Sequence, residues 1–596
     1  MVILLGILGA AFFRIQVLSS DSYALQSESN RLRVVPEEAP RGTIYDREGR
    51  PIADNVPAYS VSLFPAPPDS IRRTLQRLSP HLDLDGEAIE RLVNRATENP
   101  RFPLVVTQDA EVDQVAALEE RRPDFPEVFL EQRPKRRYHG ARSVGHALGY
   151  VGEISREELE TPFFQDYEQG MVVGKEGVER QYEAILQGER GIRYLEVDAA
   201  GRVVGSFRGQ SASPAEPGAD IQLNIDLGLT EYIDQVFPDT LNGAVVALDP
   251  EDGGVLALYS HPTGDPNDFV GGISSELWAD LSTDPDRPLV NRAVSGTYSP
   301  ASTWKLATAA IALEHDLIDP DEMMPEACTG AFQYGNVVRR CWDADGHGQL
   351  DLAGAIRHSC NVYFYQVGLL IGLESLVEEG TRLGFDRACG IDLPREAAGD
   401  FPDDLDYWER RWGYRPYENE VLQLSIGQGP NDQTPLKMAQ FYLGLARDGT
   451  APAPRLRRDD DGDRGEDWAL DLTGENLESL RDALRQVMEP GGTGHLSSLE
   501  HWDLLGKTGT AQHDPLGQRE SHAWFAGMAG PWDEDPEIVI VVLVEEGGSG
   551  SAAAAPVAAK AADYYLRRKH DIPVDTIQTL AEHLEAGEPA PWAWDE

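Results

Sequence analysis

The chain has 596 residues, of which 41% are hydrophobic and 8% aromatic, so it is long enough for more than one domain and has a globular composition. It carries 52 Lys and Arg residues against 101 Asp and Glu residues, a formal net charge of −49. This charge argues against a nucleic-acid partner, because contacts to phosphates require a basic surface.

The N-terminus reads MVILLGILGAAFFRIQVLSS, in which only residues 1–13 are uninterrupted apolar sequence. A bilayer span needs about 20 apolar residues, and the basic start and cleavage site of a signal peptide are missing. Three interpretations remain: an anchor whose upstream part is absent, a short anchor extended by residues 15–18, or a buried core helix. We favour an anchor over residues 1–18, because a polar stretch begins at Ser19. The rest of the protein then lies outside the cytoplasm.

Residues 30–230 indicate an extended segment of mixed secondary structure. The stretch PRGTIYDREGRPIADN (40–55) predicts a hairpin around the turn DREG. A helix is predicted from Val178 to Leu186, ending at Gly188. Further predicted elements are a strand at 58–64 and a helix at 85–98.

Beyond residue 230, buried strands and helices are expected. The apolar runs 243–249 and 255–260 predict a hairpin, and a long helical block follows. The predicted C-terminal elements are strands at 503–512, 521–530 and 537–546 and a helix at 553–567. Strands, then helices, then strands favour the α+β class, with one antiparallel sheet packed on a helical subdomain.

The acidic run DDDGDRGED (459–467) does not fit a calcium-binding loop. Aligning Gly462 with the invariant loop glycine would put Arg457 and Trp468 at ligand positions. We interpret the run as a solvated insertion loop.

The stretch YSPASTWK (298–305) precedes LATAAIALEHDL, a run of helix-forming residues without Gly or Pro. Ser302 is therefore expected in the first turn of a helix, with Lys305 one turn above it on the same face. A serine becomes nucleophilic beside a base of lowered pKa, and burial or a helix N-terminus lowers the pKa of a lysine. The simpler interpretation is a helix N-cap followed by a solvated lysine.

Two other motifs raise the weight of the chemical interpretation. SCN (359–361) lies between the helical runs LAGAIRH and VYFYQVGLLIG, where side chains can converge. KTG (507–509) lies inside a predicted strand, and a glycine in mid-strand commonly marks the close approach of a ligand backbone. Each motif alone is weak evidence for a nucleophilic serine, but SxxK, SxN and KTG in this order are strong evidence for one.

The ordered trio resembles the penicillin-recognising serine transferases and β-lactamases. Other stretches, among them APRGTIYDREGRPIADN, GAVVALDP, LSIGQGPNDQTPLKMAQ and HAWFAG, extend the likeness over most of the chain. The sequence thus resembles a class B penicillin-binding protein, closest to penicillin-binding protein 2 of the elongation type. It departs from that pattern at Ala301, where glycine is usual, and at Trp304, where phenylalanine is usual.

This resemblance implies four regions and a place in the cell. They are an N-terminal membrane anchor (1–18), a pedestal or dimerisation domain (19–230), a transpeptidase domain of the penicillin-binding fold (231–570) and a C-terminal tail (571–596). It further implies a single-pass protein of the cytoplasmic membrane with a periplasmic catalytic domain. Implied partners are peptidoglycan stem peptides, β-lactams, a SEDS-type glycosyltransferase and other proteins of the elongation complex.

The resemblance also implies roles in acylation. Ser302 would attack the penultimate D-alanine carbonyl of a stem peptide and release the terminal D-alanine. Lys305 would be the general base, Ser359 would relay a proton to the leaving group, and Asn361 would hold the donor's amide. No cofactor would take part in catalysis.

Roles in substrate binding follow from the KTG motif. Lys507 and Thr508 would bind the donor carboxylate, where a charge-assisted contact is strong. Gly509 would leave room for the ligand backbone. The backbone N–H groups of Ser302 and Thr510 would form the oxyanion hole.

Three of the four cysteines and one histidine are candidates for a metal site. Cys328, Cys341, His347 and Cys360 would make a closed Cys₃His site for structural zinc, although their spacing is longer than in the usual finger. The CW and GHG pieces also resemble the elongation-type subgroup. A disulfide between Cys328 and Cys341, or plain buried thiols, are the alternatives. Cys389 is expected in the core.

Two other functions share features of this sequence. A β-lactam hydrolase would use the same trio but would need a deacylating carboxylate, for which Glu420 is the nearest acidic candidate. A non-catalytic scaffold would activate a membrane glycosyltransferase through the pedestal, although intact catalytic motifs argue against that as its only role.

Overall fold

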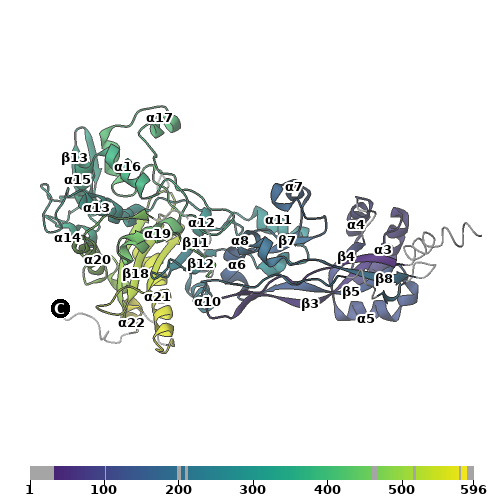
Figure 1. The fold of residues 1–596 in the computed structure, drawn as a ribbon. Coiled ribbons are helices and arrows are strands. Elements are labelled where there is room, and N and C mark those ends of the chain that lie inside the picture. The colour runs from purple at the N-terminus through teal and green to yellow at the C-terminus, as the bar shows by residue number, and fades with distance from the viewer. Residues whose placement is uncertain are drawn as a thin grey trace, which may run out of the picture.

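The computed structural model describes residues 32–98, 100, 103–197, 203–207, 213–458, 468–513, 518–575, 577 and 579–586. The expected anchor (1–18) and the acidic loop (459–467) lie outside the described residues. Within these ranges, no helix is both long enough and apolar enough to cross a bilayer. Figure 1 shows an elongated molecule, in which β3 and β5 connect a distal group of helices, α3 to α5, to a larger body of helices and one sheet.

Long antiparallel strands form the N-terminal region. Residues 53–63 of β3 (Pro51–Leu63) pair with the whole of β5 (Val128–Tyr138). The predicted hairpin at 40–55 is confirmed, because β2 (Ile44–Tyr45) pairs with β3 and Gly49 takes a φ of 81° in the turn. The other strands here are β1 (Leu32–Glu37), β4 (Leu104–Ala110), β6 (Val151–Glu153), β7 (Val172–Gly174), β8 (Gly191–Val197), β9 (Val203–Phe207) and β10 (Ile221–Gln222).

One predicted helix of this region is interrupted in the structure. The expected helix 178–186 is divided into α8 (Gly177–Gln181) and α9 (Glu183–Leu186), because Tyr182 leaves helical geometry and its hydroxyl donates to Asp392 Oδ2 at 2.5 Å. The predicted helix at 85–98 is confirmed as α4. The remaining helices are α3 (Pro68–Leu82), α4 (Gly86–Glu98), α5 (Val112–Glu120), α6 (Gly145–Leu148) and α7 (Arg156–Leu159).

A buried ion-pair cluster joins the two N-terminal stretches that the sequence singled out. Arg41 Nη2 donates to Glu179 Oε2 at 2.7 Å and to Glu183 Oε2 at 2.9 Å. Arg136 Nε donates to Glu179 Oε1 at 2.6 Å. None of these four side chains is more than 7% exposed, so the charges compensate one another away from water.

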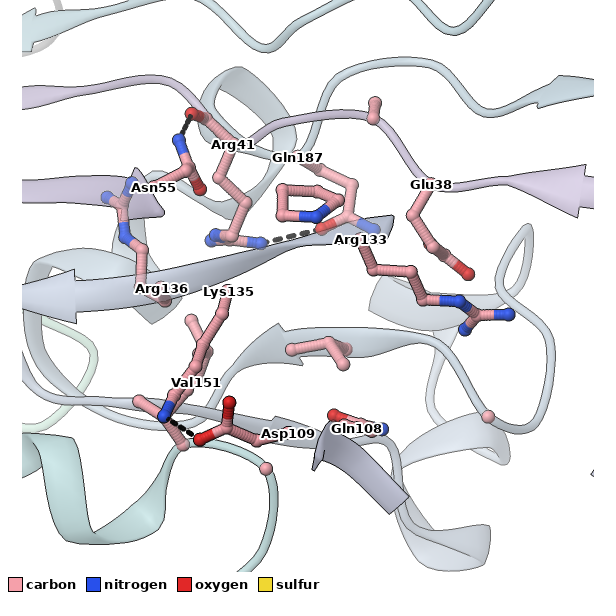
Figure 2. Close-up of a pocket in the computed structure, with 16 residues that line it drawn as sticks. Glu38, Arg41, Asn55, Gln108, Asp109, Arg133, Lys135, Arg136, Val151 and Gln187 are labelled. Atoms are coloured by element: carbon pink, nitrogen blue, oxygen red, sulfur yellow. Dashed lines mark hydrogen bonds and ion pairs between the residues drawn. The ribbon is translucent and has the colours of Figure 1, made fainter. Parts of the chain in front are cut away.

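A cavity of about 80 Å³ lies beside this cluster. Figure 2 shows Arg41 donating to Gln187 on one wall and Lys135 paired with Asp109 on the other. Because the cations of the wall are already paired with acidic or amide oxygens, we treat the cavity as part of the scaffold.

The C-terminal region is built on one five-stranded antiparallel sheet, as the α+β prediction requires. Its order is β12–β11–β19–β18–β17. All residues of the central strand β19 are buried, because α19 and α21 both pack on it. β17 is an edge strand and is therefore open on one side. The strands are β11 (Gly243–Leu248), β12 (Val255–His261), β17 (Asp503–Ala511), β18 (His522–Gly530) and β19 (Ile538–Val544).

A helical block between β12 and β17 covers this sheet. The helices of this block are α11 (Ser275–Thr283), α12 (Arg292–Ser295), α13 (Lys305–Glu314), α14 (Leu352–Arg357), α15 (Asn361–Ile371), α16 (Leu373–Arg382), α17 (Tyr407–Trp412), α18 (Val421–Leu424), α19 (Pro435–Ala446) and α20 (Gly474–Met488). Helix α10 (Leu227–Val236) precedes the first strand of the sheet. After the sheet come α21 (Ala555–Lys569) and α22 (Leu580–Glu585). Short strands β13 (Ala331–Tyr334) and β14 (Val337–Arg340) form one hairpin, and β15 (Thr450–Ala451) pairs with β16 (Trp468–Ala469).

Candidate active site

Ser302 lies in the 3₁₀ turn η6 (Ala301–Trp304), which leads directly into α13. The expected position at the start of a helix is confirmed, with a first turn tighter than an α-helix. Ala301 has a φ of 48°, a conformation that non-glycine residues adopt only when their surroundings hold them there. Ala301 N donates to Gly427 O at 3.0 Å, and Ser299 Oγ donates to the same oxygen at 2.7 Å. Ser302 therefore sits on a turn that a distant loop fixes.

Gly427 is a site residue to which the sequence analysis gave no role. A Cβ at this position would lie 2.3 Å from Ala301 O and 2.6 Å from Trp304 Cβ, and its φ is 72°. Only glycine fits such a close approach in the left-handed region. The two glycines of the quoted stretch LSIGQG were the available signal, because glycines after a short apolar run mark a turn or a close backbone contact.

Lys305 connects the first two motifs. Its Nζ donates to Ser359 O at 2.7 Å, to Ser359 Oγ at 3.2 Å and to Asn361 Oδ1 at 2.7 Å. Burial of the side chain lowers the pKa of Lys305 to about 8, so a fraction of the amine is neutral at pH 7. In the described part of the chain, no hydrogen bond joins Nζ to the Ser302 hydroxyl. Catalytic hydrogen bonds often tighten only when the substrate binds.

The SCN segment is a sharply turned junction between α14 and α15, as expected. Ser359 has a φ of 53° and is 7% exposed. Ser359 N donates to Ile356 O at 3.1 Å, and Cys360 N donates to Ala355 O at 2.9 Å. This turn brings the oxygens of Ser359 and Asn361 to the same ammonium group. A non-glycine residue in the left-handed backbone region destabilises the folded state by roughly 1–3 kcal/mol, and such residues are common at functional sites.

Lys507 lies on β17 and is fully buried. Burial and the nearby positive charge of Lys305 both lower the pKa of Lys507 well below its usual value. Its Nζ donates to Thr508 O at 3.0 Å, and its register partner on β18 is Ala526. The 3₁₀ turn that carries Ser302 packs on β17, so the first and third motifs lie next to each other.

Gly509 contacts the catalytic turn. A Cβ there would lie 3.2 Å from Pro300 O and 3.2 Å from Thr303 Cγ2. The space that we expected for a ligand backbone at this position is therefore used by the chain itself. The absence of a side chain lets η6 pack on β17, which sets the distance between Ser302 and the strand.

The hydroxyl groups of the KTG strand differ in their surroundings. Thr508 is 8% exposed, and its Oγ1 lies 2.8 Å from Thr493 Oγ1. Thr510 is exposed, and its register partner on β18 is Ala523. Thr493 was not identified from the sequence, because nothing in the local pattern links it to a strand that begins ten residues later.

The predicted metal ligands converge on one site. One ligand atom from each of Cys328, Cys341, His347 and Cys360 lies within 4.8 Å of all the others. His347 Nδ1 is 3.6 Å from Cys328 Sγ and 3.5 Å from Cys341 Sγ. Tetrahedral zinc with its usual Zn–S and Zn–N bond lengths places such a pair about 3.6 Å apart. The donor set and its dimensions therefore fit zinc.

The close contact between the thiols also favours a bound cation. A hydrogen bond with Cys360 lowers the pKa of the Cys341 thiol, while the same bond and burial raise the pKa of the Cys360 thiol. Two buried thiolates next to each other need a cation to ionise together, and zinc binds thiolates. All four cysteines are free thiols, so the alternative disulfide between Cys328 and Cys341 is not formed.

Two further predictions concern residues away from this cluster. Cys389 is buried, as expected, and burial raises the pKa of its thiol. Glu420 lies in the short 3₁₀ helix Glu418–Glu420, and the Tyr414 hydroxyl donates to its Oε1 at 3.5 Å. In the described part of the chain, Glu420 makes no hydrogen bond or ion pair with Ser302, Lys305 or Lys507.

Comparison with known proteins assigns both regions of the chain. The family model described as penicillin binding protein transpeptidase domain matches residues 243–563. The model described as penicillin-binding protein dimerisation domain matches residues 36–223. Peptidoglycan D,D-transpeptidase MrdA of Haemophilus influenzae is 32% identical over 617 residues, which cover 98% of this chain and 94% of the relative.

Solved structures of penicillin-binding proteins also resemble this chain. A penicillin-binding protein (PBP2) of Helicobacter pylori, solved in complex with MreC, matches with a TM-score of 0.78 and 27% identity over 90% of this chain and 99% of that one. A chain from a structure titled for the coordination of polymerization and crosslinking by a peptidoglycan synthase complex matches with a TM-score of 0.70 and 29% identity. It covers 94% of this chain and 96% of that one.

Proposed function

The chain belongs to the class B penicillin-binding proteins, and we propose that it is the peptidoglycan D,D-transpeptidase of cell elongation, acting through an acyl-enzyme on Ser302. The observation that carries the proposal is the trio of hydrogen bonds from Lys305 Nζ to Ser359 and Asn361. These bonds join the SxxK motif to the SxN motif through Lys305, which lies one helical turn after Ser302.

Acylation begins at the Ser302 hydroxyl. Neutral Lys305 accepts the hydroxyl proton while Oγ attacks the penultimate D-alanine carbonyl of the donor stem peptide. The backbone N–H groups of Ser302 and Thr510 stabilise the oxyanion, a contribution of about 3 kcal/mol per donor in other acyl transferases. The peptide bond to the terminal D-alanine then breaks, and Ser359 relays a proton from Lys305 to the departing amine.

Substrate binding and deacylation use the same pocket. Lys507 and Thr508 bind the donor's terminal carboxylate, and Asn361 holds its amide. When the terminal D-alanine has left, the amine of a neighbouring stem peptide attacks the Ser302 ester. A new amide bond forms, the amine loses a proton, and the Ser302 oxygen regains one. A β-lactam enters the first half of this cycle as an acyl donor.

A structural zinc ion completes the proposal. Cys328, Cys341, His347 and Cys360 would hold it, and its contribution would be to fold the segment around Cys360. Because Cys360 stands between Ser359 and Asn361, the position of this ligand sets the position of both catalytic oxygens. No step of the reaction involves the metal.

The location and partners follow from the family. We infer that residues 1–18 anchor the chain in the cytoplasmic membrane, that residues 19–230 form a pedestal and that residues 231–570 form a periplasmic transpeptidase domain. Similarity to a PBP2 solved with MreC supports partners in the elongation complex. Similarity to a peptidoglycan synthase complex supports pairing with a glycosyltransferase, for which we propose the SEDS type.

A mass measurement tests the function. The protein is incubated with benzylpenicillin and its intact mass is recorded over time, followed by peptide mapping. We expect one stable penicilloyl group on Ser302, none on the Ser302→Ala variant, and a normal adduct on the exposed control Ser295→Ala. Rapid loss of the adduct with β-lactam turnover would favour a hydrolase. No adduct in the wild type, or full support of growth by Ser302→Ala, would leave only a scaffold.

A further inference from the structure

A residue outside the three motifs contacts the third one. Thr493 Oγ1 lies 2.8 Å from Thr508 Oγ1, and either hydroxyl can be the donor. We propose that Thr493 is a positioning residue for the donor carboxylate: it orients the Thr508 hydroxyl so that its O–H points to the ligand. The proposal rests on the proposed function, in which Thr508 binds that carboxylate.

The argument follows from the hydrogen-bonding capacity of a hydroxyl, which has one donor and two acceptor positions. If Thr508 donates to Thr493, it offers only lone pairs to the ligand, and these repel a carboxylate. If Thr493 donates to Thr508, the Thr508 proton is free for the carboxylate and its oxygen is already satisfied. Hydrogen bonds in such a chain also strengthen one another. An anionic ligand therefore selects the second arrangement, which exists only while residue 493 carries a hydroxyl.

The loop that carries Thr493 is tightly fixed to the end of α20. Gly494 N donates to Val487 O at 2.9 Å, and Gly492 N donates to Glu489 O at 2.9 Å. A Cβ on Gly492 would lie 2.3 Å from Val487 O, so this backbone path requires glycine. Thr493 is thus held between two glycines whose positions leave its side chain little freedom to move away from β17.

The same loop contacts the segment that leads to Ser359. Arg357 Nη2 donates to Pro490 O, and a Cβ on Gly491 would come within 3.0 Å of that nitrogen. Arg357 is the last residue of α14 and precedes Ser359 by two positions. The loop of residues 490–494 therefore contacts one segment on the acylating side of the pocket and one on the carboxylate side. Thr493 therefore belongs to a loop that is fixed on both sides, which holds its hydroxyl against Thr508.

The experiment compares a carboxylate probe with a neutral one. Second-order acylation rate constants are measured with benzylpenicillin and with its methyl ester for wild type, Thr493→Val and Thr493→Ser. Thr283→Val serves as the matched control, because the exposed Thr283 Oγ1 donates to Ala279 O within α11. For Thr493→Val we expect about a tenfold loss with the acid and less than twofold with the ester. Thr493→Ser restores the wild-type rates, and the loss lies in apparent affinity rather than in the limiting acylation rate.

Each other outcome overturns the proposal. An equal loss with both probes would mean that Thr493 only supports the fold, and an unchanged preference for the acid would mean that Thr508 needs no orientation. If wild type itself does not distinguish the acid from the ester, the proposed carboxylate role of Thr508 fails as well. A missing adduct at Ser302 would instead remove the proposed function, so the two failures are distinguishable.

Discussion

Lys305 Nζ donates a 2.7 Å hydrogen bond to Asn361 Oδ1 across 56 residues of sequence. Both groups are polar, and the lysine is fully buried. A lysine in such a place loses hydration of its charged form, and the amide oxygen returns only part of that stabilisation. The pKa of the Lys305 amine therefore lies closer to neutral pH than that of an exposed lysine. A general base needs such a pKa.

The first prediction concerns pH. Burial lowers the pKa of Lys305 to about 8, and only the neutral amine can accept the Ser302 proton. The neutral fraction is about one tenth at pH 7 and about nine tenths at pH 9, so acylation by benzylpenicillin should accelerate about tenfold over this interval. Stopped-flow acylation rates would check this. A Lys305→Arg variant should be slow and without the rise, and a flat wild-type profile would contradict the role of Lys305.

The second prediction uses an isosteric change at the partner. Asn361→Asp would place a carboxylate against Lys305 Nζ and raise the pKa of that amine. Acylation at pH 7 should fall, and the midpoint of its pH profile should move upward, whereas Asn361→Ala should slow the reaction without an upward shift. Rates measured from pH 6 to pH 10 distinguish these outcomes. An unchanged midpoint in Asn361→Asp would mean that the hydrogen bond does not control the base.

The third prediction concerns the metal. Elemental analysis of purified protein should find about one zinc ion per chain, because the donor atoms match tetrahedral zinc. Cys341→Ala and His347→Ala should lose the metal and also acylate slowly, since Cys360 positions Ser359 and Asn361. Cys389→Ala is the matched control and should retain the metal. Protein that acylates normally without metal, or that carries a disulfide between Cys328 and Cys341, would contradict this site.

The fourth prediction concerns stability of the pedestal. Glu179→Gln leaves two buried guanidinium groups short of a charge and should lower the free energy of unfolding by about 3–5 kcal/mol. The exposed control Glu87→Gln should cost less than about 0.5 kcal/mol, because its pair with Arg91 is on the surface. Denaturant unfolding curves would measure both. Equal stability of the two variants would show that the cluster does not hold the pedestal.

The same cluster gives a pH dependence of stability. Burial opposes ionisation of Glu179, but Arg136 and Arg41 outweigh it and lower the pKa of the folded state. Its contribution is therefore present above the unfolded pKa of about 4.5 and is lost as the pH falls through the lower folded value. Wild type should lose more stability than Glu179→Gln on acidification.

Local patterns in the sequence determined most of the elements. The apolar runs at 243–249, 255–260 and 537–546 became the buried strands β11, β12 and β19, because buried strands leave a continuous apolar run in the sequence. The hairpin at 40–55 and the helix after Ser302 were equally readable from turn residues and helix formers. The order of SxxK, SxN and KTG predicted the chemistry through its resemblance to a known family, and three cysteines with one histidine predicted a metal site.

Only the tertiary structure decided what surrounds those residues. The close approaches of Gly427 to the Ser302 turn and of Gly509 to Pro300 depend on contacts between segments more than 100 residues apart, and no local period encodes them. The contact of Thr493 with Thr508 spans only 15 residues, but it too depends on how a loop folds back onto β17. The lowered pKa of Lys305 needs burial by several elements. The sequence determines which functional groups the side chains carry. Their distances from one another and the dielectric environment around them are set only when the chain folds and buries them.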